Sequence, residues 1–267
     1  MRRFHALLVC LIVGGCSGVA LDPPTQSEAS ALTEPGDFTG PAWSEDGTRV
    51  SFSGPGYRGL YDVAVDGGEV REIVAPDKRT WFRHGWQDDR VVRPVLGQQP
   101  GLEVTPHDGV VRVLNANPLA GPRLELRRDD VVWVDGAEER WLTHGEDRFC
   151  DPVASLDWSQ VAVVGLQTGV HVLDTDTGEA LAHAGPGTSP AWHPDGGLLV
   201  FERTEDDGYQ LTAGDLWALD LDAEQIRPLT ATAAIEQHPA VSPDGTRVAF
   251  IRDGAVWVSA LGEEVSP

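Results

Sequence analysis

The chain has 267 residues, enough for one large all-β domain or two small domains with a proper core. Its formal net charge of -22 repels phosphate backbones and anionic lipid surfaces, so nucleic acid is not an expected partner. Glycine (30 residues) and proline (19 residues) interrupt short apolar runs along the whole length, which favours many strands over helices.

The N-terminus has the composition of an export signal. Two arginines precede an apolar stretch over residues 6–13, which is too short for an ordinary membrane-spanning helix. The stretch ends in VGGC, which resembles the bacterial lipobox, where cleavage leaves a lipidated cysteine first. We therefore expect residues 1–15 to be a lipoprotein signal peptide, Cys16 to carry the lipid and residues 16–29 to form a polar tether. The alternative is plain secretion with a fortuitous cysteine.

Cysteine usage agrees with a lipoprotein. Cys10 leaves with the signal and Cys16 is the lipid attachment site, so Cys150 remains alone and no internal disulfide can form. Cys150 is expected to be a small buried apolar residue. Ser17 follows the lipidated cysteine, and by resemblance to enteric lipoproteins this favours the outer membrane, with the protein facing the periplasm.

A formula of proline, apolar residue, polar turn and apolar strand recurs along the chain. It is clear in PAWSEDGTRVSF from Pro41, PAWHPDGGLLVF from Pro190 and PAVSPDGTRVAF from Pro239, and three further copies are degenerate. Proline and glycine supply the backbone angles of such a turn, and aspartate can hydrogen-bond its backbone. A second Asp/Gly turn follows each first turn, so six pairs of hairpins alternate along the chain. The six first turns centre on Gly47, Asp88, Gly121, Trp158, Gly196 and Gly245.

The strands beside these turns are apolar at nearly every position, as in VVWV, VAVV, LLVF and VAFI. A strand with one face in solvent alternates apolar and polar residues. These strands do not alternate, so they are expected to be covered on both faces. Units of about 40 residues with such strands are typical of β-propeller blades. Residues 30–267 are therefore predicted to form an all-β, six-bladed β-propeller, with Trp43, Trp86 and Trp192 filling space between blades. The last copy lacks a final strand, and residues 31–33 (ALT) are predicted to supply this outer strand and close the ring.

PAWSEDG, PAWHPDG and PAVSPDG, each followed by an apolar strand, resemble the repeat of the TolB-like (WD-repeat-like) β-propeller family. The resemblance covers most of the predicted mature chain and implies that each motif marks the turn between the two inner strands of a blade. TolB itself carries an α/β domain ahead of its propeller and is not usually lipid-anchored. The chain is therefore expected to be a TolB-like propeller lipoprotein rather than TolB. Prolyl-oligopeptidase-type peptidases pair a similar propeller with a hydrolase domain, but this sequence contains no G-x-S-x-G.

No motif for chemistry is found, because H-E-x-x-H and Walker-type loops are both absent from the sequence. DTDTGE from Asp174 lacks the glycine and distal glutamate of a calcium loop and indicates an Asp-stabilised hairpin turn. His84, Asp151 and His238 lie at or just before the proline position, so they could face one another across a channel mouth as a metal or catalytic cluster. The alternative is that they are scattered rim residues. His193 replaces serine inside its turn and is expected to be exposed. We therefore assign no catalytic residue, metal ligand or cofactor.

The longest insertion, residues 203–217, interrupts the connection between two strands of one blade and forms either a binding surface or a passive loop. The leading hypothesis for function is a lipid-anchored, monomeric, non-catalytic scaffold that binds another envelope protein. A lyase- or cyclase-type enzyme would instead need convergent titratable groups in the central channel. A carbohydrate-binding module would need solvent-exposed tryptophans in a groove.

Overall fold

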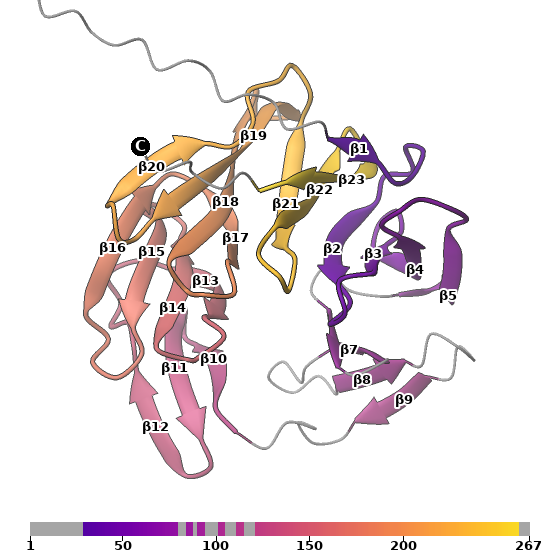
Figure 1. Cartoon of the computed structure of the whole chain (residues 1–267). Coiled ribbons are helices and arrows are strands. Elements are labelled where there is room, and N and C mark those ends of the chain that lie inside the picture. Colours follow the sequence, from indigo (N-terminus) through magenta and orange to yellow (C-terminus); the bar gives the residue numbers. More distant parts are fainter. Residues whose placement is uncertain are drawn as a thin grey trace, which may run out of the picture.

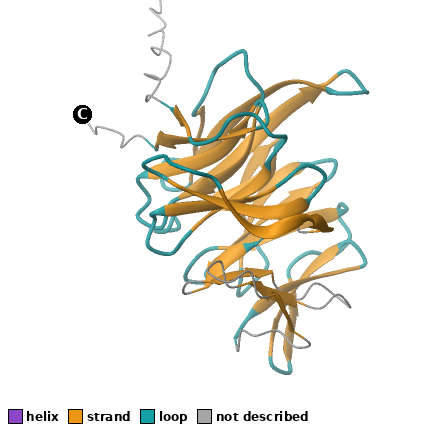
Figure 2. Cartoon of the chain, turned by 90° about the vertical axis from the view of Figure 1, so that its right-hand side faces the viewer, coloured by secondary structure: helices purple, strands orange, loops and turns teal. Residues whose placement is uncertain are grey.

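The computed structural model describes residues 29–79, 84–87, 90–93, 101–104, 111–114 and 121–261. The predicted signal peptide, Cys16 and almost all of the tether therefore lie outside the described residues. Within the described ranges every regular element is a β-strand (Figures 1 and 2). No helix in these ranges is long and apolar enough to span a membrane.

The strands form six antiparallel sheets, numbered 1 to 6 in chain order, and consecutive strands pair within each sheet. Sheet 1 contains β2 (Thr39–Trp43), β3 (Arg49–Ser53), β4 (Arg58–Ala64) and β5 (Arg71–Arg79); sheet 2 contains β6 (Gly85–Gln87), β7 (Arg90–Arg93), β8 (Gly101–Val104) and β9 (Val111–Leu114); sheet 3 contains β10 (Arg123–Arg127), β11 (Asp130–Asp135) and β12 (Glu138–Trp141). Sheet 4 contains β13 (Phe149–Ala154), β14 (Gln160–Gly165), β15 (Gly169–Asp174) and β16 (Ala180–Gly185); sheet 5 contains β17 (Thr188–Trp192), β18 (Leu198–Asp206), β19 (Leu211–Asp220) and β20 (Gln225–Pro228); sheet 6 contains β21 (Glu236–Val241), β22 (Arg247–Arg252), β23 (Ala255–Ala260) and β1 (Ser30–Ala31).

Sheet 3 has three described strands where the other sheets have four. In the repeat, β10 corresponds to the second strand of a unit, because it follows the predicted first turn at Gly121. The first strand expected for this unit falls in residues 115–120, outside the described residues.

Sheet 6 joins the two ends of the described chain. Ser30 and Ala31 pair with Val258 and Trp257 of β23, and the N–H of Leu32 donates to the carbonyl of Val256 at 2.8 Å. The prediction that the N-terminal segment supplies an outer strand to the last unit is confirmed at this sheet (Figure 1).

Neighbouring sheets pack side by side. The first strand of sheet 1 contacts both β21 and β22 of sheet 6 and also β6 of sheet 2; β10 and β11 contact β13; β13 contacts β17; and β17 contacts β21. Five junctions between consecutive sheets are therefore seen in the described residues: 6 with 1, 1 with 2, 3 with 4, 4 with 5 and 5 with 6. Residues 115–120, which connect sheets 2 and 3, lie outside them.

The apolar strands are buried on both faces, as their composition predicts. Phe52, Phe201 and Phe250 occupy the same place in sheets 1, 5 and 6, and all three are fully buried. Burying one such side chain contributes roughly 1.5–3 kcal/mol. Adjacent positions such as Val161 to Val163 are buried as well, so each sheet packs on two neighbours at once.

Candidate functional site

A pocket of about 470 Å³ lies where the first strands of sheets 1, 4, 5 and 6 converge. That volume is within the roughly 300–1,000 Å³ of small-ligand sites. Its walls are mainly proline, alanine and tryptophan. The polar side chains in its lining are His84, Ser189, His193, His238 and Ser242.

Each of these four strands carries a bulge at the residue before its proline. Gly40, Asp151, Ser189 and His238 have φ values of 59°, 55°, 53° and 55°, and the pairing register shifts across each of them. This left-handed conformation costs a non-glycine residue about 1–2 kcal/mol. A bulge re-aims its side chain and removes its backbone from the ladder. The sequence signal for this bulge is the position just before each repeated proline. The residue type at that position varies, so composition alone does not reveal the bulge.

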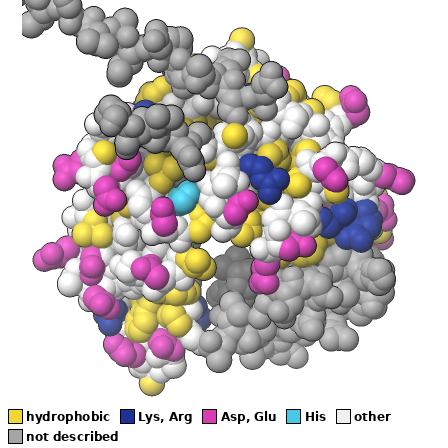
Figure 3. Space-filling view, in the orientation of Figure 1, with side chains coloured by type: hydrophobic (Ala, Val, Ile, Leu, Met, Phe, Trp, Pro, Cys, Tyr) yellow, Lys and Arg dark blue, Asp and Glu magenta, His cyan; other side chains and the backbone are white. Residues whose placement is uncertain are grey.

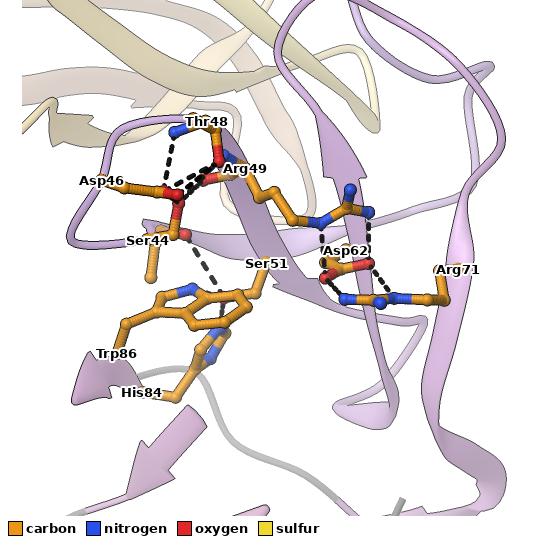
Figure 4. Close-up of polar contacts among 10 residues, drawn as sticks. Ser44, Asp46, Thr48, Arg49, Ser51, Asp62, Arg71, His84 and Trp86 are labelled. Atoms are coloured by element: carbon orange, nitrogen blue, oxygen red, sulfur yellow. Dashed lines mark hydrogen bonds and ion pairs between the residues drawn. The ribbon is translucent and has the colours of Figure 1, made fainter. Parts of the chain in front are cut away.

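The structure brings together two of the three predicted channel-mouth residues. His84 and His238 both line the pocket, whereas Asp151 is not among its described lining residues. The Nε2 atom of His84 lies 2.9 Å from the hydroxyl of Ser51 in sheet 1, and that hydroxyl also accepts the indole N–H of Trp86 at 2.9 Å (Figure 4). Within the described ranges, no group of three His, Cys, Asp or Glu side chains is placed to hold a metal ion.

Glu202 is the functional-site carboxylate that the sequence analysis missed. It lies on β18, is 4% exposed, and accepts hydrogen bonds from the Thr188 hydroxyl at 2.8 Å and from the backbone N–H of His238 in the next sheet. The Nδ1 atom of His238 is 3.4 Å from the Glu202 carboxylate and 3.5 Å from the Ser189 hydroxyl. The serine and the carboxylate therefore approach the same ring nitrogen. In a catalytic triad the serine and the carboxylate meet opposite nitrogens of the imidazole, so the arrangement of Ser189, His238 and Glu202 differs from a triad.

The other polar lining residues are held within turns. His193 is half-buried rather than exposed, which corrects the expectation from sequence. Its Nδ1 atom lies 2.7 Å from the carboxylate of Asp195, and its Nε2 atom lies 3.2 Å from the carbonyl of Gly245 in sheet 6. The imidazole thus replaces the turn serine and also links two sheets. Ser242 donates its hydroxyl to Asp244 in the equivalent turn of sheet 6.

The DTDTGE segment is an Asp-stabilised turn, as predicted. The Asp174 carboxylate accepts the backbone N–H groups of Thr177 at 2.8 Å and Asp176 at 3.0 Å. These bonds, led by the one from Thr177, hold the pKa of Asp174 below its usual range. The Asp174 carboxylate therefore stabilises the turn by accepting its backbone N–H groups.

The tryptophans join sheets, as predicted. The indole N–H of Trp43 donates to the carbonyl of Ala240 at 2.8 Å, and that of Trp192 donates to the carbonyl of Val153 at 2.9 Å. Among the described tryptophans only Trp141 is exposed, at 39%. Trp43 and Trp192 also line the pocket, where Trp43 is buried and Trp192 is half-buried.

The insertion over residues 203–217 is a long hairpin rather than a loop, because β18 and β19 extend to nine and ten residues. The guanidinium of Arg203 stacks 4.0 Å from the ring of Trp217 and donates to the carbonyls of Ala184 and Pro186 in the connection from sheet 4. Tyr209 stands at the hairpin tip and is 98% exposed. Cys150, on β13, is half-buried and packs against the apolar cluster between sheets 4 and 5.

No protein-family model and no curated protein matches the sequence. Among solved structures, the chain is similar to a gluconolactonase from Xanthomonas campestris, with 15% identity, a TM-score of 0.60, and coverage of 88% of this chain and 91% of that one. Hydrazine synthase from Kuenenia stuttgartiensis is 12% identical, with a TM-score of 0.50 over 82% of this chain and 74% of that one. A putative TolB from Agrobacterium tumefaciens is 18% identical over 85% of this chain and 77% of that one, but its TM-score of 0.38 carries no weight.

The sheets and these neighbours together define the fold as a β-propeller. Sheets that pack side by side with their first strands around a central pocket are the blades of such a fold. Identities of 15% and below extend the likeness no further than the fold, so function has to be argued from the site.

Proposed function

We propose that this chain is a lipid-anchored cell-envelope protein whose TolB-like, six-bladed propeller binds another envelope protein without catalysing a reaction. Cys16 would carry the lipid after removal of residues 1–15, at the outer membrane facing the periplasm. The sixth junction, between sheets 2 and 3, would close the ring. The lipobox-like ending, the three clear repeats and the five observed junctions support this proposal.

The non-catalytic assignment depends on the arrangement around His238. Its Nδ1 atom faces both Ser189 and Glu202, and Glu202 also accepts the backbone N–H of the same histidine. This geometry fixes the imidazole at the seam between sheets 5 and 6. It differs from the serine, histidine and carboxylate arrangement of a catalytic triad.

Affinity purification from detergent-solubilised envelopes tests the proposal. Intact protein should fractionate with membranes and bring down an envelope protein. The Cys16→Ala variant should be released into the soluble fraction, because the acyl chains that provide membrane affinity are missing. If no envelope protein is recovered with either form while the purified chain turns over a small substrate, the protein is an enzyme instead.

An enzyme with its active site in the channel is the second candidate. It is favoured by His238, which lines a pocket large enough for a sugar and lies 3.4 Å from the buried carboxylate of Glu202 behind it. Gluconolactone, named for the activity of the Xanthomonas neighbour, is a reasonable first substrate. A non-catalytic protein should leave its rate of hydrolysis at the buffer level, with identical traces for wild type, His238→Ala and Glu202→Gln.

A further inference from the structure

Strand direction divides the propeller into two faces. In sheets 1, 4, 5 and 6 the turns between the second and third strands lie at one end, here called the tip face, and this end also holds the described connections from sheet 4 to sheet 5 and from sheet 5 to sheet 6. Turns between the first and second strands, and between the third and fourth, lie at the other end, here called the tether face. The assignment follows because strands alternate in direction within every sheet and the first strands of sheets 1, 4, 5 and 6 meet at one pocket.

The chain enters the propeller at the tether face. Ser30 pairs with Val258 near the end of β23, and the following residues run back toward the turn before that strand, where the N–H of Gly36 donates to the carbonyl of Gly254 at 3.0 Å. The end of β23 belongs to the tether face and Gly254 to the tip face. If Cys16 is lipidated, as proposed above, the lipid anchor is therefore joined to the propeller at the tether face.

The tip face carries large apolar side chains at its turns. Tyr57, Leu166 and Tyr209 lie in the second-to-third-strand turns of sheets 1, 4 and 5 and are 45%, 58% and 98% exposed. On the tether face, Leu156 is the exposed large apolar residue among the described turns. Turns normally carry glycine, proline and small polar residues, and exposed tyrosine is enriched at protein interfaces. Leu166 and Tyr209 lie on the neighbouring sheets 4 and 5, and Tyr57 lies on sheet 1, on the far side of sheet 6 from them; all three belong to turns at the same end of the molecule.

The longest of these turns is preorganised. Pairing of β18 with β19 continues out to Asp206 opposite Leu211, and the stack of Arg203 on Trp217 fixes the base of the hairpin. At its tip the Asp207 carboxylate accepts the N–H groups of Tyr209 at 2.9 Å and Gln210 at 3.0 Å. Tyr209 is thus presented on a closed turn, and a rigid contact loses less entropy on binding than a mobile loop.

The negative charge of the chain favours some partners for the tip face over others. Acidic side chains are spread over the surface in Figure 3 and basic ones are few, and Glu205, Asp206 and Asp207 lie next to Tyr209 in the sequence. A second copy, also at -22, is repelled, and so is an anionic lipid surface. A protein with basic residues around an apolar patch is complementary to the negative charge of this chain and to its exposed apolar side chains.

We propose that the protein partner docks on the tip face, with Tyr57, Leu166 and Tyr209 as apolar contacts and with lysine or arginine on its own contact surface. The proposal rests on the scaffold function above and adds which face binds and what chemistry the partner presents.

Site-specific photo-crosslinking in living cells tests it. The photoreactive residue p-benzoylphenylalanine is placed at Tyr209 or Leu166 on the tip face, and at Leu156 or Leu181 as matched exposed positions elsewhere. Tip-face positions should give one protein adduct whose cross-linked peptide contains lysine or arginine, and the matched positions should give none. With Tyr57→Ser, Leu166→Ser and Tyr209→Ser combined, recovery of that partner should fall roughly tenfold or more, while Leu181→Ser with Ile226→Ser, both exposed and outside the pocket, leaves it unchanged. Thermal melting of both variants shows whether the fold is kept.

The outcomes distinguish failure of the tip-face assignment from failure of the scaffold function. The same partner cross-linked at Leu156 and not at Tyr209 overturns the tip-face assignment and keeps the scaffold function. An adduct with lipid or with a second copy of this chain at Tyr209 also overturns the assignment. The absence of any envelope protein from all four positions and from the affinity purification overturns both.

Discussion

Asp62 is a charged residue in the interior that opposite charges neutralise. Asp62 on β4 is fully buried and receives two hydrogen bonds from each of two arginines: Arg49 at 2.8 and 2.9 Å, and Arg71 at 2.5 and 3.0 Å (Figure 4). Burial alone would raise the pKa of this carboxyl, but the arginine hydrogen bonds outweigh it and the pKa is lowered. The group therefore remains ionised while buried, and both arginines depend on it.

Replacing this carboxylate should be costly. Asp62→Ala removes the carboxylate that accepts from Arg49 and Arg71, whose side chains are 30% and 42% exposed, and the loss of such charge-assisted hydrogen bonds costs about 1.5–3 kcal/mol. Urea unfolding followed by circular dichroism measures the loss. Asp176→Ala is the matched control, since Asp176 is 88% exposed and meets Arg140 at 3.1 Å, and such a pair contributes less than about 1 kcal/mol. Equal losses for the two variants would show that Asp62 does not stabilise the sheet.

At the scale of elements, the first turn of a blade is an aspartate-centred unit. The Ser44 hydroxyl donates to Asp46 at 2.7 Å, and Ser155 donates to Asp157 at 2.7 Å in sheet 4. In sheet 6 the same bond from Ser242, together with the N–H of Thr246, lowers the pKa of Asp244 to about 2. Each carboxylate is therefore needed in its charged form.

Acid should loosen these turns over a defined range. A folded pKa of about 2 lies below the value of about 3.9 for an unfolded aspartate. The stabilisation from Asp244 is thus fully present above about pH 4 and is lost as the pH falls toward 2. Thermal melts from pH 7 to pH 2 should show Asp244→Ala less stable than wild type at neutral pH and nearly equal to it at pH 2. Parallel curves with a constant gap would rule out this titration as the cause.

Elements whose chemistry is local could be predicted from the sequence, and those that depend on a neighbouring sheet could not. The turns at Gly47, Gly196 and Gly245 follow from proline, aspartate and glycine within a few residues. Even the distant pairing of β1 follows from counting strands in the last repeat. Glu202 gave no such signal, because its partners are Thr188 on the strand before it and His238 one sheet further on. The polar run EDDG suggested a loop, yet pairing across the hairpin continues through it as far as Asp206.

At the scale of the whole molecule, contacts between sheets repeat as regularly as the motif does. Carbonyls of the first-turn glycines accept from the neighbouring sheet: Gly245 faces Nε2 of His193 at 3.2 Å, and Gly47 accepts Nη2 of Arg247 at 2.9 Å. Sheets 5, 6 and 1 are therefore tied to one another at the level of their first turns. We expect the propeller to unfold as one unit for this reason.

The N-terminal strand tests that expectation. Leu32 is buried in a cluster with Trp43, Phe52 and Val256, so it packs on sheets 1 and 6 together. Leu32→Ala should lower the free energy of unfolding by about 2–5 kcal/mol, the usual cost of such a cavity. Tryptophan fluorescence and circular dichroism should still report one coincident transition. Two separated transitions would mean that sheet 6 unfolds on its own and that the sheets are not coupled around the ring.

The contribution of a hydrogen bond between sheets can be tested by comparing two tryptophans. Both stack against an arginine, but only one of them donates its indole N–H to a neighbouring sheet. Trp43 lies under Arg247 at 4.7 Å and donates its N–H to Ala240 in the next sheet. Trp257 lies under Arg252 at 4.5 Å, but its Nε1 atom is buried and, among the described residues, has no hydrogen-bond partner. Replacing either by phenylalanine removes the same volume, while only Trp43→Phe breaks a bond between sheets. Trp43→Phe should therefore be about 1–3 kcal/mol more destabilising than Trp257→Phe in urea unfolding. A smaller loss for Trp43→Phe than for Trp257→Phe would show that packing alone, without these bonds, holds the sheets together.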